Sequence, residues 1–349
     1  MLAAWGILYY LVFAVKSRPS ILLLLFLLAF ILRMIADQDT IISADDDLIY
    51  YLLATLAPVI AISTLGALWD DKRSAISMAQ VGIAACVLVV AAAVFDFSGW
   101  RSNTANSLGR FSYDVLDPIT VGNVGAMTAI AGLCWWLRGK SSISVLAIGV
   151  GLIVLVMGLS RGPMLSLGCA FAAYLILSKR YRLLILLTSV VTAFIATSAF
   201  ENLARFLRFD SVGVDVSSTA RFDVMRRSIE SMVESPLFGS PYLDPVTGLY
   251  PHNLFVEAGL TLGLSGLVAA LFLSIRALQS ANVHMRRGDI FLFLTLIYWF
   301  VEAQVSGAIW TNVMFWSCVS LALRRLVLVR NESGRLYGYG PRRLDQISQ

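Results

Sequence analysis

The chain has 349 residues, of which 58% are hydrophobic and 14% are charged, and its mean hydropathy is +0.78. A water-soluble domain carries about 25% charged residues, because water must solvate its surface. The composition therefore excludes an ordinary soluble enzyme and indicates an integral membrane protein. A net charge of +5 would suggest nucleic-acid binding in a soluble protein, but in a membrane protein it mostly reflects which loops face the cytoplasm. No nucleic-acid partner is expected.

The hydrophobic residues fall in blocks whose length suits membrane-spanning helices. About 20 apolar residues cross the hydrocarbon core as a helix, and the strand-like alternation of a barrel is absent from these blocks. We expect a single all-α, polytopic integral membrane domain over residues 1–349, with about eleven transmembrane helices. These helices are predicted at residues 2–15, 21–36, 48–69, 75–95, 118–137, 143–159, 163–178, 183–200, 253–275, 290–307 and 312–329.

Basic residues are distributed unevenly between alternate loops. One set of loops, together with the C-terminal tail, carries 18 of the 27 lysines and arginines, whereas the opposite set carries 8. Because cytoplasmic loops are enriched in basic residues, this bias places the N-terminus outside and the tail, residues 331–349, in the cytoplasm. The loop Asp37–Asp47 has five aspartates and no basic residue, as expected of an outer loop.

Residues 201–252 form a large outer loop that is predicted to be partly helical. Hydrophobic residues recur in it at helical spacing, at Phe222, Met225, Ile229 and Met232. Ser217, Ser218 and Thr219 offer N-caps before them, and Pro236 follows. The pattern predicts an amphipathic helix that ends near Glu234 and lies on the membrane or over a cavity.

His252 is the only histidine on the predicted outer side, and it lies where the large loop returns to the membrane. Histidine suits proton transfer near neutral pH, although a loop histidine or an interfacial anchor is the alternative interpretation. Asn253 is a natural N-cap for the next helix, and Glu257 shares its face one turn further on. A carboxylate at that depth usually faces a cavity or a partner. We therefore take His252 and Glu257 as candidate catalytic residues and Asn253 as a candidate substrate ligand.

Arg161 lies in a short outer turn, immediately before Gly162 and Pro163. Proline suits the first turn of a helix, so the N-terminal N–H groups of that helix should point outward. Unpaired N–H groups and a guanidinium both favour phosphate. Arg161 is therefore a candidate substrate ligand; the alternative is that it extends to lipid headgroups.

Three more arginines lie on the predicted loop helix. Arg226 has Glu230 four residues later and Arg227 has Asp223 four residues earlier, so surface pairs account for both. Replacing Arg227 by alanine should accordingly be tolerated. Arg221 has no carboxylate at that spacing, which leaves it freer for an anionic ligand. We take Arg221 as a candidate substrate ligand, and we also include Arg226, which lies on the same predicted helix.

No motif in the sequence indicates a metal or another cofactor. The glycine-rich phosphate loop, the H-E-x-x-H zinc motif and the G-x-S-x-G nucleophile turn are all absent. The four cysteines lie far apart within apolar blocks, which is typical of packing residues. Asp45–Asp47 are consecutive and so converge poorly on one ion. We expect neither a metal site nor a cofactor.

Taken together, these residues resemble the O-antigen ligase/polymerase family, which comprises the Wzy and WaaL proteins and their relatives in exopolysaccharide export. The resemblance covers residues 145–275. It rests on Ser160-Arg161-Gly162, Arg221, Pro236-Leu237-Phe238-Gly239 and the run His252-Asn253-x3-Glu257-x-Gly259-x3-Gly263-x2-Gly266. Members usually have about twelve spans with both ends cytoplasmic, so the eleven spans predicted here, with an outer N-terminus, are a departure.

The resemblance implies a metal-independent, inverting glycosyltransferase of the C-type membrane architecture. It would lie in the bacterial inner membrane and act on the periplasmic face, on glycans carried by undecaprenyl diphosphate. Arg161 and Arg221 would stabilise the leaving diphosphate. His252 would activate the acceptor hydroxyl, with Glu257 orienting it. The implied partners are the lipid-linked glycan, a glycan or lipid A core acceptor, membrane lipids and a chain-length regulator protein.

Among the activities that this resemblance allows, we favour polymerisation of O-antigen or exopolysaccharide repeat units. The alternative is an O-antigen ligase, which transfers glycan to the lipid A core. We favour the polymerase because the sequence shows no extra periplasmic domain for engaging an acceptor. A lipid-linked sugar transporter or flippase is the competing class. Arg33 and Glu302 would be consistent with a transporter, but a transporter is expected to have ionisable groups near the midplane of the membrane. Here the candidate groups cluster near the outer face.

The predicted topology can be tested by labelling from outside. A maleimide that cannot cross the membrane should label Ser217→Cys in intact cells, because the loop 201–252 is expected to be periplasmic. The matched variant Ser141→Cys, in a predicted cytoplasmic loop, should react only after permeabilisation. Labelling of Ser217→Cys only after permeabilisation would invert the topology.

Overall fold

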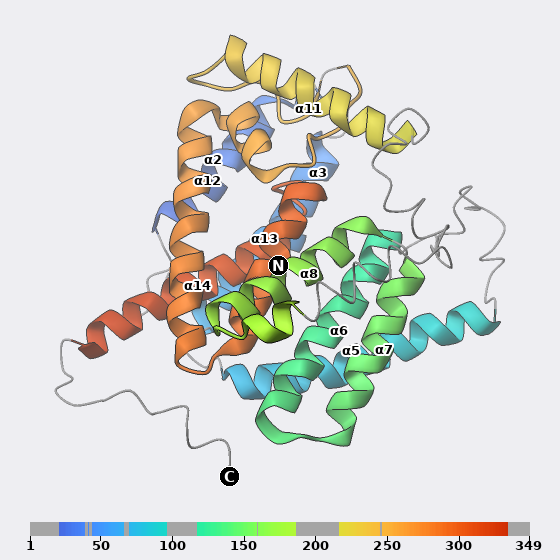
Figure 1. Cartoon of the computed structure of the whole chain (residues 1–349). Coiled ribbons are helices and arrows are strands. Elements are labelled where there is room, and N and C mark those ends of the chain that lie inside the picture. Colours follow the sequence, from blue (N-terminus) through green and yellow to red (C-terminus); the bar gives the residue numbers. More distant parts are fainter. Residues whose placement is uncertain are drawn as a thin grey trace.

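The computed structural model describes residues 21–38, 41, 44–65, 70–95, 117–158, 160–185, 216–244 and 246–333 (Figure 1). In these ranges the chain forms helices and no strands, which confirms the predicted all-α class. The helices are α2 (Ile21–Ala36), α3 (Ala44–Tyr50), η2 (Tyr51–Leu56), α4 (Ala57–Leu65), α5 (Asp71–Phe95), α6 (Pro118–Gly139), α7 (Ser142–Gly158), α8 (Arg161–Leu177), α11 (Val216–Glu234), α12 (Leu254–Arg286), α13 (Ile290–Val305) and α14 (Val313–Ser333). The segments α3, η2 and α4 follow one another without a break, and η2 is a π-helical stretch.

Three of these helices are long and apolar enough to cross a membrane: α5, α6 and α12. Apolar helices of 10–17 residues lie in α2, α7, α8, α13 and α14. The predicted helix at 2–15, and most of that at 183–200, lie outside the described residues, so the count of eleven spans stays a prediction. One boundary was wrong: α12 continues to Arg286, well past the predicted end at residue 275.

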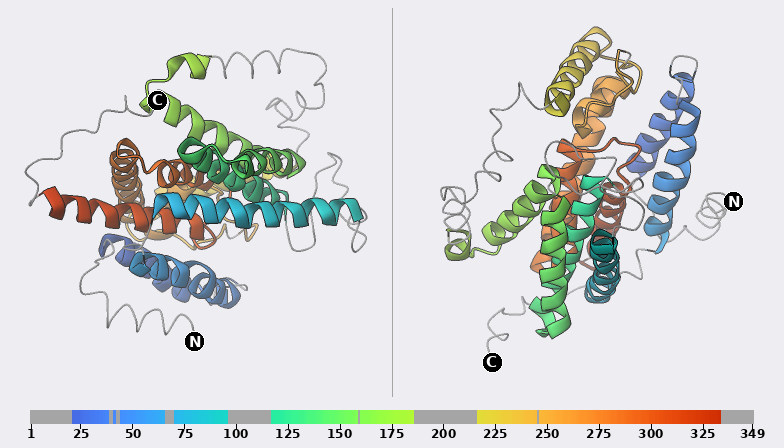
Figure 2. Two further views of the ribbon diagram at one scale, coloured as in Figure 1. Left: turned by 90° about the horizontal axis from the view of Figure 1, so that it is seen from below. Right: turned by 90° about the vertical axis from the view of Figure 1, so that its right-hand side faces the viewer.

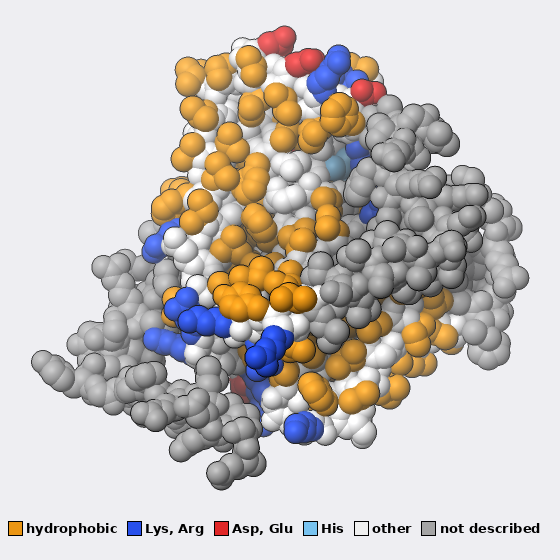
Figure 3. All heavy atoms as spheres, in the orientation of Figure 1, with side chains coloured by type: hydrophobic (Ala, Val, Ile, Leu, Met, Phe, Trp, Pro, Cys, Tyr) orange, Lys and Arg blue, Asp and Glu red, His pale blue; other side chains and the backbone are white. Residues whose placement is uncertain are grey.

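Many large hydrophobic side chains are exposed on the described helices, as the composition leads one to expect. Figure 3 shows them over one face of the helices, with lysines and arginines gathered towards the lower end. Leu88 of α5 is 70% exposed and Val156 of α7 is 55% exposed. Apolar patches of this extent are rare on a soluble monomer and mark a surface that contacts lipid or protein.

At one end of the molecule, loops predicted to be cytoplasmic meet at Asp71. Its carboxylate accepts hydrogen bonds from the Arg138 side chain, at the end of α6, and from the N–H groups of Phe291 and Leu292. Asp71 thereby caps the first turn of α13 and ties α5, α6 and α13 together.

At the opposite end, loops predicted to be outside also meet. The Tyr242 hydroxyl donates to Asp47, at 2.8 Å, and its N–H donates to Asp37, at 3.0 Å. α11 lies across this end, away from the α6–α7 turn (Figures 1 and 2). Alternate loops therefore gather at opposite ends of the helices, as the predicted topology requires.

α6 and α7 pack backbone against backbone through two glycines. A Cβ on Gly125 would lie 2.5 Å from the carbonyl oxygen of Gly151, and a Cβ on Gly151 would lie 2.6 Å from that of Gly125. Only glycine permits this approach, which is common between membrane helices. At the start of α6, Asp117 accepts a hydrogen bond of 2.7 Å from the N–H of Thr120, so the helix begins at a fixed point.

α12 is kinked at Gly263, and the large loop docks into the kink. Gly263 has φ 64° and ψ −160°, a conformation that is essentially restricted to glycine. The kink breaks the regular helical pairing around it. The N–H of Leu264 then donates to the carbonyl of Pro236, at 2.8 Å, while the carbonyl of Leu260 accepts from Ser240, at 2.6 Å.

This docking explains two parts of the sequence motif that the family resemblance left unexplained. Gly239 adopts φ +75° where the Pro-Leu-Phe-Gly segment turns, and a Cβ there would meet the carbonyl of Leu260 at 2.5 Å. Gly263 does not face another helix, because the atoms that a Cβ there would meet are the carbonyl groups of Pro236 and Leu237 in the loop. Gly259 does meet another helix, since a Cβ there would touch Met232 of α11.

α11 confirms the predicted amphipathic helix, but one of its ion pairs differs from the prediction. Arg226 pairs with Glu230 as expected, at 3.3 Å. Arg227 instead makes a two-pronged contact with Asp244, with Nη2 2.8 Å and Nε 3.1 Å from its oxygens. Burial raises the pKa of Asp244, but hydrogen bonds from Arg227 and Thr247 outweigh this and hold it below its usual value. Spacing within one helix cannot reveal such a partner from a distant turn.

The Arg227–Asp244 pair predicts that Arg227→Ala, expected from the sequence to be tolerated, loosens the loop after α11. A buried carboxylate that loses its bidentate partner is left uncompensated. Limited proteolysis should cut Arg227→Ala faster than the parent within residues 235–250. Arg226→Ala, which removes only an exposed pair, is the matched control and should resemble the parent. Equal resistance of both variants would contradict this role.

Candidate active site

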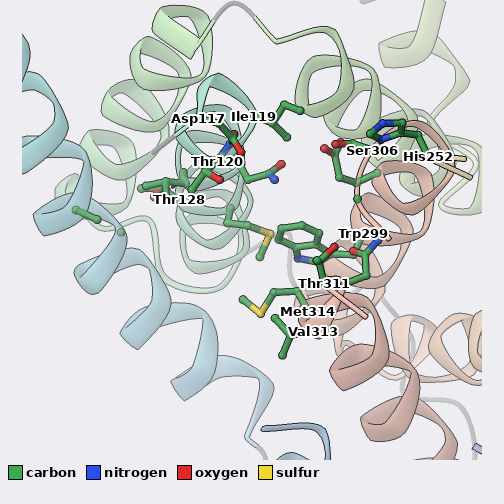
Figure 4. Close-up of a pocket in the computed structure, with 18 of the residues that line it drawn as sticks. Asp117, Ile119, Thr120, Thr128, His252, Trp299, Ser306, Thr311, Val313 and Met314 are labelled. Carbon is green, nitrogen blue, oxygen red and sulfur yellow. Dashed lines mark hydrogen bonds between the residues drawn. The ribbon is translucent and has the colours of Figure 1, made fainter. Parts of the chain in front are cut away.

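A cavity of about 630 Å³ lies at the end of the helices where the large loop docks. One wall is the polar side of α6, with Asp117, Thr120, Asn123 and Thr128. Figure 4 shows labelled residues of this wall facing His252, Trp299 and Ser306 across the cavity. The size is typical of a small-molecule site, and polar groups from segments far apart in sequence converge on it.

His252 reaches the cavity from a strained turn just before α12. Its φ is +54°, which is uncommon for a residue with a side chain and is found where surrounding contacts impose it. The Asn253 side chain accepts hydrogen bonds of 3.1 Å from Phe255 and Val256 and donates to the carbonyl of Gln304. Asn253 is thus the predicted N-cap, and these bonds hold the turn. Its role as a substrate ligand remains a prediction.

The His252 ring is available for proton transfer. It stacks beside Tyr250, with ring centroids 4.2 Å apart, and Nδ1 is buried without a hydrogen-bond partner among the described residues. Burial and, to a smaller extent, the charge of Arg221 lower the pKa of His252 to about 4. The imidazole is therefore neutral at pH 7 and can accept a proton.

Arg221 is the predicted arginine that lines the cavity. It lies near the start of α11, and its charge acts on both His252 and Glu302. Arg226 is exposed and held by Glu230, and it does not line the cavity. Arg161 is the first residue of α8, with its Nε buried, and it is also not a lining residue. Substrate binding by Arg161 and Arg226 remains a prediction.

Glu257 lies beside the site rather than in it. Its side chain is fully buried and accepts a hydrogen bond of 2.9 Å from the N–H of Ile309. Within the described part of the chain no hydrogen bond joins it to His252. Glu257 instead holds the turn before α14, from which Ser306 and Thr311 reach the cavity. The geometry supports a positioning role, and direct catalysis by Glu257 remains a prediction.

Glu302 of α13 is the site residue that the sequence analysis did not select. It is 2% exposed, lines the cavity and accepts a hydrogen bond of 3.0 Å from the Ser166 hydroxyl. Its other oxygen, Oε1, has no hydrogen-bond partner among the described residues. Its signal in the sequence is a lone glutamate within an apolar block, which a transporter could equally contain.

The position of Glu302 also accounts for the glycine in the Ser-Arg-Gly turn. A Cβ on Gly162 would lie 3.0 Å from the Glu302 carboxylate, so a larger residue would crowd it. The first turn of α8, where we expected a bound phosphate, therefore already faces a carboxylate. A helix N-terminus favours such a negative charge.

Among the residues that the structure describes, no group of three or more His, Cys, Asp and Glu side chains could hold a metal ion. The polar groups at the cavity instead form hydrogen bonds with one another. The N–H of Thr120, for example, donates to the side chain of Asp117. The arrangement offers a cation, a neutral base and carboxylates around one space.

A family model described as O-antigen ligase matches residues 145–271. These residues are thus similar to the O-antigen ligase family. This confirms the resemblance seen in the sequence. Arg221 and His252 lie within the match, whereas Glu302 lies beyond it on α13. A search of curated proteins gave no match to the chain.

The buried position of His252 predicts an unusual pH dependence. A group whose pKa is lowered to about 4 stays neutral as pH falls from 8 to 5.5 and protonates only nearer pH 4. Exchange of the imidazole C2 proton, followed by mass spectrometry, should report this midpoint. In Arg221→Gln the midpoint should rise, because the charge of Arg221, one of the two causes of the lowered pKa, is removed. A midpoint near 6.5 in the parent would contradict the burial of His252.

Proposed function

We propose that this chain transfers a glycan from a lipid diphosphate to an acceptor hydroxyl, with the cavity as its active site on the periplasmic face. The family domain supports glycan transfer of the O-antigen ligase or polymerase type in general. One observation carries the assignment to this cavity: Arg221, neutral His252 and buried Glu302 all line it. The donor in this proposal is a glycan linked to undecaprenyl diphosphate.

The proposed reaction inverts the anomeric carbon. The acceptor oxygen forms a bond to that carbon while the bond to the diphosphate oxygen breaks on the opposite side. The hydroxyl proton passes to His252, and undecaprenyl diphosphate leaves. Because negative charge develops on the leaving oxygen, a fixed guanidinium there stabilises the transition state, and Arg221 supplies it. No metal is required.

Glu302 has a positioning task in this proposal. Its Oε1, which has no hydrogen-bond partner among the described residues, can accept a hydrogen bond from a sugar hydroxyl, while Ser166 donates to the other oxygen and Gly162 leaves room for the carboxylate. Asp117 and Thr120 offer further polar groups on the facing wall. Holding both sugars in line is a large part of such catalysis, because a bound, oriented pair reacts without further loss of entropy.

Within this class we propose a polymerase, whose acceptor is a second lipid-linked glycan; transfer to a lipid A core is the alternative. The features that a transporter could claim have local explanations. Arg33 pairs with Asp37 at 3.0 Å near the end of α2, and Glu302 lies in the cavity at the outer end. Partnership with a chain-length regulator stays a prediction.

Replacing His252 by alanine should abolish transfer without loss of folded protein. Removing a general base typically lowers the rate by about 10²–10⁴-fold. His284→Gln, at the opposite end beside Asp289, is the matched control and should keep activity. The measurement is product ladders from purified variants given a lipid-linked donor and either a lipid-linked or a lipid A core acceptor.

The same variants separate the roles of the site residues. Donor binding should persist in His252→Ala, because the arginine rather than the histidine holds the diphosphate. Ladders of normal length from His252→Ala would remove His252 from the mechanism. A single transfer to the lipid A core acceptor by the parent protein, with no ladder, would show that the protein is a ligase and not a polymerase.

A further inference from the structure

Four aromatic rings form a row that ends at His252. The rings of Tyr50 and Trp310 have centroids 5.7 Å apart with their planes at 90°, and those of Trp310 and Tyr250 are 6.3 Å apart at 84°. The ring of Tyr250 then lies 4.2 Å from the imidazole of His252. Contacts of this kind hold aromatic rings in fixed orientations. We refer to Tyr50, Trp310, Tyr250 and His252 as the aromatic row.

The aromatic row brings together segments that are distant in the sequence. Tyr50 is the last residue of α3, Tyr250 lies in the large loop, and Trp310 lies in the turn between α13 and α14. The carbonyl of Trp310 accepts a hydrogen bond from the hydroxyl of Thr55 in η2, which ties this turn to the helix that follows Tyr50. Tyr50 and Trp310 lie outside residues 145–271, so the family match covers only part of the row.

The aromatic row borders the cavity. Tyr50, Tyr250 and His252 all line it, and Tyr50 is 50% exposed, so part of its ring remains accessible. Burial is the main cause that raises the pKa of Tyr250 above its usual value. Its hydroxyl therefore stays protonated at neutral pH and can donate a hydrogen bond. The row thus offers an aromatic surface with polar tips beside the proposed base.

Asn312 adds a polar group two residues after Trp310. Its side chain lines the cavity although the residue is only 7% exposed, and it makes no hydrogen bond to the residues that the structure describes. A Cβ on Gly307 would lie 3.1 Å from the amide nitrogen, so the glycine leaves room for this side chain. Buried amides are normally hydrogen-bonded, and an amide can both donate and accept. The unused capacity of Asn312 therefore points to a ligand in the cavity.

We propose that the aromatic row and Asn312 bind the acceptor sugar, whose hydroxyl His252 deprotonates. This inference rests on the proposed function, because it takes His252 to receive the acceptor's proton. A sugar ring has a C–H face that packs on aromatic rings and a rim of hydroxyl groups that an amide can bind. A sugar that lies against Tyr50 and Tyr250 and is held by Asn312 presents a hydroxyl to the adjacent imidazole.

The acceptor rather than the donor suits this side of the cavity. In the proposed inversion, the acceptor approaches the anomeric carbon from the side opposite the diphosphate. The diphosphate is drawn to Arg221, whereas the aromatic row and Asn312 carry no charge while His252 is neutral. Such a surface provides no countercharge for a diphosphate but can pack on a glycan. The row therefore holds the acceptor oxygen in line with the bond that breaks.

Removing the exposed ring should weaken the acceptor and not the donor. The assay uses soluble acceptors: the repeat-unit oligosaccharide released by mild acid from the host's lipid-linked glycan, and the lipid A core oligosaccharide. Neither carries the lipid diphosphate, so each can serve only as acceptor. Tyr50→Ala should raise the acceptor KM by roughly 3–10-fold, as expected for the loss of an aromatic contact, while the donor KM stays the same. Tyr50→Phe should restore most of the acceptor affinity.

Tyr181→Ala is the matched control, because Tyr181 is 53% exposed just after α8, at the predicted cytoplasmic end. It should leave both KM values unchanged. An unchanged acceptor KM in Tyr50→Ala would overturn the proposal. A rise in the donor KM alone, or an equal rise in both, would also overturn it.

Saturation-transfer NMR tests the acceptor subsite without relying on transfer. Irradiation of the protein's aromatic protons, in lipid nanodiscs, should pass saturation mainly to one sugar of the soluble acceptor, the sugar that becomes linked in the product. The signal should weaken in Tyr50→Ala and Asn312→Ala and persist in Tyr181→Ala. Equal signals in Tyr50→Ala and the parent would refute the subsite. A signal that depends on Tyr50, in a parent protein that transfers no glycan, would refute the proposed function alone.

Discussion

The docking of the loop at 236–240 into the kink of α12 is the interaction on which the site depends. In a membrane environment an unpaired backbone group costs several kcal/mol, so a kink persists only where other groups pair with the freed N–H and carbonyl. Pro236 and Ser240 do this at Gly263. The same docking fixes the segment that joins α11 to α12. Arg221, near the start of α11, and His252, just before α12, therefore both line the cavity.

The site combines charged and titratable groups from two parts of the chain. The loop supplies the cation and the base, while the helices supply the carboxylates, Glu302 on α13 and Asp117 at the start of α6. The charge of Arg221 acts on Glu302, and burial keeps His252 neutral. Because the loop is held by Asp244 and by the contacts of Tyr242, the distance between the two sources is set by the fold.

Sequence periodicity predicted the helices well where apolar blocks end at polar residues, as in α6 and α7. It failed for α12, because its last turns carry polar residues such as Gln279 and Arg286 that suggested a loop. His252 and Arg221 could be selected because each is unusual in its local context. Glu302 and the Arg227–Asp244 pair could not, because they depend on which distant segments meet. Spacing within one element contains no information about such contacts.

The central claim is that one cavity holds the donor diphosphate beside Arg221, within reach of His252 and Glu302. A structure of the protein in lipid nanodiscs with undecaprenyl diphosphate, the leaving group of the proposed reaction, tests it most directly. The account predicts phosphate oxygens in contact with the Arg221 guanidinium, inside the cavity between α6 and α13. A diphosphate bound outside this cavity, with Arg221 and His252 remote from it, would contradict the account.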